Sequence, residues 1–168
     1  MSPLIVEATV ISVFPAISRD PNIPGSIETH SLISVSAVLS GIIPGGSTTI
    51  LLAQEGGKVG PLEILVPSDP LVRSGEHYLL FLAPDNRKQP PNTSGSPRYS
   101  AVGVWAGKVK SENEKVRFLP RSSQSFQELE NTDASAFLTA VKAKINNTVV
   151  PSKRNVIPHP GIGIVTGK

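Results

Sequence analysis

SGEHYLLFLAP, residues 74–84, is an apolar run of strand length that Gly75 opens and Pro84 closes. Its central part, YLLFL, is apolar at every consecutive position. Successive side chains of a strand point to opposite faces, so such a run is apolar on both faces, which is typical of a strand inside a core. We therefore predict that residues 75–82 form the central buried strand of the protein.

The segments around this run also have the pattern of strands. β-branched residues dominate residues 4–14, LIVEATVISVF, and residues 28–39, ETHSLISVSAVL, alternate between an apolar face and a mixed face. Further strands are expected at residues 48–53, 62–66, 99–109 and 115–119. Gly103 and Gly107 predict a bulge within the 99–109 strand. The glycine-rich residues 54–61 predict a flexible loop or bulge, and the polar residues 85–97 predict a surface excursion.

The apolar period lengthens to three or four residues near the end of the chain. Phe137, Leu138, Val141 and Ile145 share one helical stripe, and Thr132 or Asp133 suits an N-cap. We expect a helix from about residue 133 to about residue 145, with its stripe on the sheet. The chain then reads as one domain over residues 4–147, followed by a Pro/Gly-rich tail or linker at residues 148–168.

Composition gives a broad expectation about compartment and partners. Charged residues make up 17% of the chain, compared with roughly 25% in average soluble proteins. This favours an exported protein of the extracellular space or cell envelope, bacterial and with its signal peptide removed before Met1, although a cytoplasmic location stays open. The net charge of +3 comes from scattered basic residues, so nucleic acid is not an expected partner. No apolar run reaches the ~18 residues of a membrane span.

The reactive residue types do not combine into a recognisable catalytic or metal site. The chain has no cysteine, which excludes disulfides, thiol catalysis and cysteine-ligated zinc. His30, His77 and His159 are far apart in sequence, and none has a carboxylate at metal-ligand spacing. Glu76 and His77 are neighbours in a strand and should face opposite sides. We expect no cofactor, no metal and no identifiable catalytic residue.

The order of the strands resembles a known family. VEATVISV (residues 6–13), AVLSG (37–41), SGEHYLLFL (74–82) and YSAVGVWAGKV (99–109) are similar to the strands of netrin and tissue-inhibitor-of-metalloproteinase (NTR-like) domains. The same plan occurs in bacterial exported proteins of unassigned function, and the resemblance covers about residues 4–119. It implies an OB-type barrel. The animal inhibitors act through an N-terminal cysteine, which this chain lacks, so the resemblance carries over no functional residue.

The expected fold class is mainly β, a five- to six-stranded antiparallel OB-like barrel with a C-terminal helix, and a β-sandwich is the alternative. The expected function is a non-enzymatic binding or protein-interaction module for an unknown protein or extracellular ligand. Alternatives are a hydrolase with an unrecognised site, or an OB-type oligonucleotide or oligosaccharide binder. For such binding, the candidate residues are Tyr99, Trp105, Lys108 and Arg117.

Overall fold

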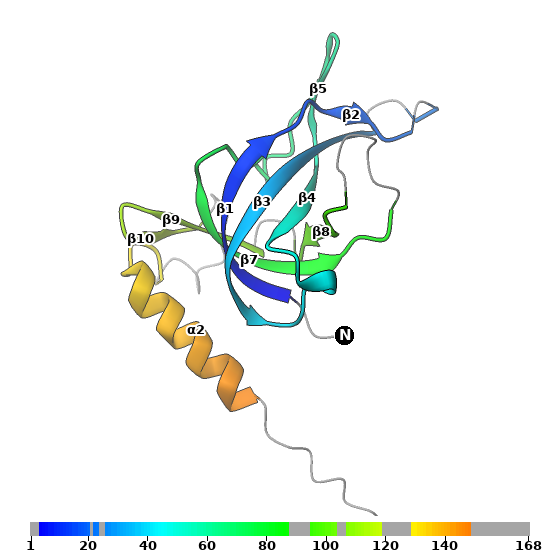
Figure 1. Cartoon of the computed structure of the whole chain (residues 1–168). Coiled ribbons are helices and arrows are strands. Elements are labelled where there is room, and N and C mark those ends of the chain that lie inside the picture. Colours follow the sequence, from blue (N-terminus) through cyan, green and yellow to red (C-terminus); the bar gives the residue numbers. More distant parts are fainter. Residues whose placement is uncertain are drawn as a thin grey trace, which may run out of the picture.

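A computed structural model describes residues 4–20, 22–23, 26–87, 95–103, 107–118 and 129–148 (Figure 1). The elements are β1 Leu4–Val13, β2 Ile17–Ser18, β3 Ile27–Ser40, the 3-10 turn η1 Pro44–Gly46, β4 Thr49–Glu55, β5 Gly57–Val59, β6 Leu62–Ile64, β7 His77–Pro84, β8 Arg98–Ala101, β9 Lys108–Glu112, β10 Lys115–Arg117 and α2 Ala134–Thr148. The protein is mainly β, as expected.

Five strands close into a barrel in the order β1-β3-β4-β8-β7, and β7 pairs back onto β1. The barrel pairs are antiparallel except for β4 and β8, which run parallel. This is an OB-like barrel with a C-terminal helix, which confirms the predicted fold class. The β-sandwich alternative was wrong, because the β1–β7 pairing joins the two sides into one closed sheet.

The strand β7 has the central position predicted for it. One edge pairs with β1, and the other pairs with β9 over His77–Leu80 and with β8 over Leu82–Pro84. Its side chains alternate between two cores. Tyr78, Leu80 and Leu82 fill the barrel interior, whereas Leu79 packs with Val109 and Val116 on the outer face. The apolar residues of β7 are consecutive because alternate side chains pack into two different cores, the barrel interior and the outer core under α2.

The predicted strand over residues 99–109 is divided between β8 and β9, and residues 104–106 lie outside the described chain. Gly107 begins the second half in a very crowded place. A Cβ atom there would lie 2.5 Å from the carbonyl oxygen of Val102 and 2.9 Å from that of Phe81. Only glycine allows the backbone to approach β7 this closely. The break lets two short strands share one edge of β7.

The C-terminal helix covers the outer core. The Asp133 carboxylate accepts a hydrogen bond from the Ala136 backbone N–H at 3.0 Å, which caps the helix as predicted. The predicted apolar stripe packs on Ile5, Leu79, Val109 and Val116, and Figure 1 shows α2 outside the barrel, beginning next to β10. The helix ends at Thr148, three residues later than predicted. Residues 149–168, most of the predicted tail, lie outside the described residues.

The glycine-rich segment 54–61 is more ordered than the predicted loop. Gly57–Val59 and Leu62–Ile64 pair as a small hairpin, which Figure 1 shows at one end of the barrel. Gly57 has a φ of +122°, and a Cβ atom there would lie 2.4 Å from the Thr29 hydroxyl oxygen. The glycine is thus needed where the hairpin leaves β4 and passes over β3.

Candidate functional site

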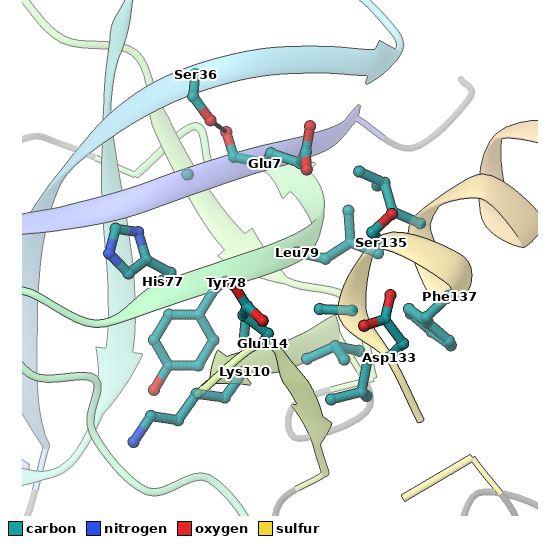
Figure 2. Close-up of a pocket in the computed structure, with 16 residues that line it drawn as sticks. Glu7, Ser36, His77, Tyr78, Leu79, Lys110, Glu114, Asp133, Ser135 and Phe137 are labelled. Atoms are coloured by element: carbon teal, nitrogen blue, oxygen red, sulfur yellow. Dashed lines mark hydrogen bonds between the residues drawn. The ribbon is translucent and has the colours of Figure 1, made fainter. Parts of the chain in front are cut away.

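A groove of about 600 Å³ lies between the beginning of α2 and the outer face of β1, β7 and β9 (Figure 2). We call it the α2 groove. Its size is within the range of ~300–1,000 Å³ that is usual for ligand pockets. The residues that line it are Glu7, Ala8, Ser36, His77, Tyr78, Leu79, Val109, Lys110, Ser111, Glu114, Val116, Asp133, Ala134, Ser135, Phe137 and Leu138.

The floor of the α2 groove is apolar and belongs to the outer core. Leu79 and Val109 form a cross-strand pair between β7 and β9, so their side chains lie on the same face of the sheet. Phe137 and Leu138 meet this face from α2 and are only partly buried. The helix therefore closes one side of the groove but leaves apolar surface open to a ligand.

The rim of the α2 groove is acidic. Glu7 comes from β1, Glu114 from the turn between β9 and β10, and Asp133 from the helix cap, and Figure 2 shows these carboxylates around the space beside β7 and α2. Within the described part of the chain, none of the three forms a salt bridge. Three negative charges thus surround an apolar floor without a basic partner.

Lys110 does not neutralise this rim, although it lines the same groove. It is the cross-strand partner of Tyr78, whose side chain belongs to the barrel core. Its ammonium is 2.9 Å from a Glu76 carboxylate oxygen and 3.0 Å from one of Glu112. These two hydrogen bonds raise the pKa of Lys110. Figure 2 shows the ammonium beyond the Tyr78 ring and away from α2.

Glu76 belongs to that separate cluster, as the predicted alternation requires. It accepts hydrogen bonds from the Tyr78 hydroxyl and from the Arg73 backbone N–H, both at 2.8 Å. Burial acts to raise the pKa of Glu76, but the hydrogen bonds from Lys110, Tyr78 and Arg73 outweigh it and lower the pKa. Burial and the adjacent carboxylate raise the pKa of Tyr78 far above its usual range. Tyr78 is therefore a neutral hydrogen-bond donor at any physiological pH.

His77 faces the groove and contacts a hydroxyl group on the neighbouring strand. Its Nδ1 atom is 2.8 Å from the Thr9 hydroxyl oxygen on β1. The nearby Ser36 hydroxyl donates to the Glu7 backbone carbonyl at 3.0 Å. The hydrogen bonds of the described residues therefore connect His77 to neither a serine nor a carboxylate. In catalysis by a hydroxyl nucleophile, a third group orients the base, and none of the described hydrogen bonds gives His77 such a group.

The residues predicted for binding do not form one surface. Tyr99 is 3% exposed and lies in the barrel core. Lys108 is 1% exposed, because its cross-strand partner Leu80 faces the barrel interior and Lys108 enters with it. Arg117 is half-exposed and contacts Asn131 and Glu130. Trp105 lies outside the described residues. The side chains of Tyr99 and Lys108 are thus buried, Tyr99 lines a different pocket beside Arg87 and Arg98, and the role of these residues in binding stays a prediction.

The structure contains a buried ionic cluster on the outer face of β3 and β8 that was not predicted from the sequence. Glu28 and His30 are each 1% exposed and 2.6 Å apart. Arg98 pairs with Glu28 and lies 3.0 Å from Asp85, and Arg87 is 2.7 Å from Glu28. The E-T-H spacing, which places Glu28 and His30 on one face of a strand, was the available signal.

The electrostatics of the ionic cluster indicate a structural role. Burial acts to raise the pKa of Glu28, but its hydrogen bond with His30 and the charges of Arg98 and Arg87 outweigh it and lower the pKa. Burial also acts to raise the pKa of Asp85. The hydrogen bonds from Arg87 and the charges of Arg98 and Arg87 outweigh it, so the pKa of Asp85 falls far below its usual range. Acids and bases are balanced within the cluster. Each acid of the cluster has a basic partner among the described residues, and these pairs hold the ends of β3, β7 and β8 together.

The described residues contain no group of three or more His, Cys, Asp or Glu side chains able to hold a metal ion. No described helix combines the length and the apolar character needed to cross a membrane.

Comparison of the chain with protein-family models, curated proteins and solved structures finds no match. The chemistry of the α2 groove is therefore read from its own residues.

Proposed function

We propose that this protein is a non-enzymatic binding module that holds a protein or peptide partner in the α2 groove. The observation that carries the proposal is the partly open apolar floor between Leu79, Val109, Phe137 and Leu138, bordered by polar groups from β1, β3, β7, β9 and α2. Concave apolar surface with a few converging polar groups is the usual form of a binding site. The protein would supply shape and charge rather than chemistry.

The two alternatives have less support among the described contacts. A hydrolase of this type needs a hydroxyl, a base and a third group that orients the base. Among the described contacts, His77 reaches the Thr9 hydroxyl but no carboxylate, and His30 is buried beside Glu28. An oligonucleotide binder needs free basic and aromatic side chains on the barrel face. There, Arg87 and Arg98 are paired with Glu28 and Asp85, and Tyr99 faces the core.

Export from the cell and kinship with NTR-like proteins are part of the same proposal. The low charged fraction favours export, and the OB-like strand order followed by a helix agrees with the resemblance of residues 4–119. Fractionation of the native host with an antibody against this protein tests export. Recovery of the protein in the extracellular or envelope fraction is expected, and recovery with cytosolic markers would overturn this part.

The groove itself is tested by filling it. Ser135 is exposed and lines the groove, so Ser135→Trp should occupy the space without disturbing the core. Ala140 is exposed on the same helix and does not line the groove, so Ala140→Trp is the matched control. Peptides are selected from a random display library on the wild-type chain, and their affinities for both variants are measured.

Selected peptides should bind the Ala140→Trp variant as they bind the wild type and should lose about tenfold or more in affinity for Ser135→Trp, because a filled pocket excludes its ligand. Equal binding to both variants would place the binding site elsewhere and would overturn the proposal. Failure of the library to yield any specific peptide would also count against it.

A further inference from the structure

Building on the proposed binding function, we infer that the α2 groove selects a cationic amphipathic segment of a partner protein, in which Lys or Arg side chains flank apolar ones. The apolar floor takes the apolar side chains, and Glu7, Glu114 and Asp133 take the cations. Opposite charges at a rim both steer and select the partner.

The rim of the groove is negatively charged, whereas the chain as a whole is positively charged. The protein carries a net charge of +3, so its average surface would repel a cationic segment. Lys110 lines the groove, but its ammonium is bound by Glu76 and Glu112 on the other face of β9. The acidic rim is therefore a local feature that depends on where β1, the β9–β10 turn and α2 meet.

One opposing effect is the dipole of α2, whose positive N-terminal end lies at the groove. A helix N-terminus favours anions by ~0.3–1 kcal/mol when exposed. Here the Asp133 carboxylate accepts the Ala136 N–H and places a full negative charge at that end. Glu7 and Glu114 lie on other elements and add two further charges. The net field at the groove is therefore negative, and it disfavours an anionic ligand.

The apolar floor excludes a simple metal or small cation as the intended ligand. Leu79 and Val109 line the groove together with the charged groups, and an ion without an apolar part would leave this apolar surface in contact with water. A peptide segment satisfies both features, because Lys and Arg carry their charge at the end of a long apolar stem. The groove is then filled by stems and neighbouring apolar side chains, with the cations at the rim.

Matched peptides test the charge preference. A twelve-residue peptide of alternating Lys and Leu is compared with two peptides in which every Lys is replaced by Ser or by Glu. Affinity is measured by calorimetry on the full chain at low and high salt. The lysine peptide should bind most tightly and should weaken as salt rises to about 0.5 M, because exposed charges are then screened.

Protein variants test which carboxylates are responsible. Glu7→Gln and Glu114→Gln each remove one rim charge at constant size and should weaken binding of the lysine peptide about two- to fivefold at low salt, as expected for exposed ion pairs. Glu63→Gln removes an exposed charge on β6, away from the groove, and should leave the affinity unchanged. Equal effects of Glu7→Gln and Glu63→Gln would overturn the inference.

The outcomes separate this inference from the proposed function. If the serine peptide binds as well as the lysine peptide and Ser135→Trp blocks both, the groove binds peptides but the charge preference is wrong. If Ser135→Trp blocks neither, both proposals fail. A different occupant of the groove would be the chain's own basic residues Lys153 and Arg154. Changes in the amide resonances of the groove when Lys153→Ser and Arg154→Ser are introduced, without any peptide, would identify that occupant and overturn the inference.

Discussion

Lys108 and Asp69 form an ion pair at one end of the barrel, where the side chain of Lys108 is wholly buried. The Lys108 ammonium also donates to the Pro70 carbonyl at 2.8 Å. The Gln54 amide donates to Asp69 and Pro70, and its oxygen accepts the Val72 backbone N–H. Residues 69–72 are thereby held across the barrel end, and the Val72 side chain joins the core.

Lys108→Met should destabilise the protein by about 3–5 kcal/mol, because it leaves the mostly buried Asp69 carboxylate without its partner. Adding Asp69→Asn removes the orphaned charge and should restore a large part of this loss. Urea unfolding followed by circular dichroism measures both. The exposed Lys142→Met is the control and should change stability by less than about 0.5 kcal/mol. Equal stability of the single and double variants would show that the ion pair is not responsible.

The Lys108–Asp69 pair also shows where sequence reasoning stops. The continuous apolar run within residues 74–84 predicts β7 correctly, because the burial of a strand on both faces can be recognised from its own consecutive residues. The pairing of Lys108 with Asp69 depends on barrel closure and on the split between β8 and β9, neither of which has a local signal. A lysine in a strand that reads as a hairpin is normally solvated. Its burial follows only from the register that places it opposite Leu80.

The candidate site was hidden for the same reason. Glu7, Glu114 and Asp133 belong to three segments that only the closed barrel and the docked helix bring together. The helix stripe and its Asp133 cap were predictable from their spacing, so half of the groove wall was foreseeable. The facing wall requires knowing that β1 and β9 pair with opposite edges of β7.

The stability of the protein should fall in acid because of the ionic cluster around Glu28. The pKa values of Glu28 and Asp85 in the folded state lie below their ordinary values of 4.5 and 3.8. A lowered folded-state pKa adds stability above the unfolded value, and this stability is lost as the pH falls through the folded value. Urea midpoints measured between about pH 7 and about pH 3 should therefore decline.

Glu28→Gln tests this origin. The variant should be less stable than the wild type at neutral pH, because Arg98 and Arg87 lose a charged partner. It should then lose less stability on acidification, since one of the responsible groups no longer titrates. Glu63→Gln should keep the wild-type pH dependence. An unchanged pH profile in Glu28→Gln would assign the acid sensitivity to other carboxylates.

Gly107→Ala should destabilise the protein more than Gly60→Ala, because Gly107 is crowded by backbone atoms whereas Gly60 has a positive φ but open space around it. The added methyl would meet the Val102 and Phe81 carbonyl oxygens, which belong to backbone and cannot rotate away, so we expect a loss of about 2–3 kcal/mol. Gly60 has a φ of +57° and open space around its Cβ position, so Gly60→Ala should cost about 1–2 kcal/mol. Thermal or urea unfolding compares the two, and a smaller loss for Gly107→Ala would show that β8 and β9 can separate cheaply.

Asp133→Ala should fray the beginning of α2. The variant loses the hydrogen bond to the Ala136 N–H, and such caps contribute about 1 kcal/mol. Because Phe137 follows one turn later, loosening of the cap also disturbs the groove wall. Hydrogen exchange of the Ala136 amide should accelerate in Asp133→Ala and stay close to wild type in Asp133→Ser, which can still cap. Ser135→Ala, which changes an exposed neighbour, is the control. Unchanged exchange in Asp133→Ala would mean that packing on Val116 and Leu79 alone fixes the first turn.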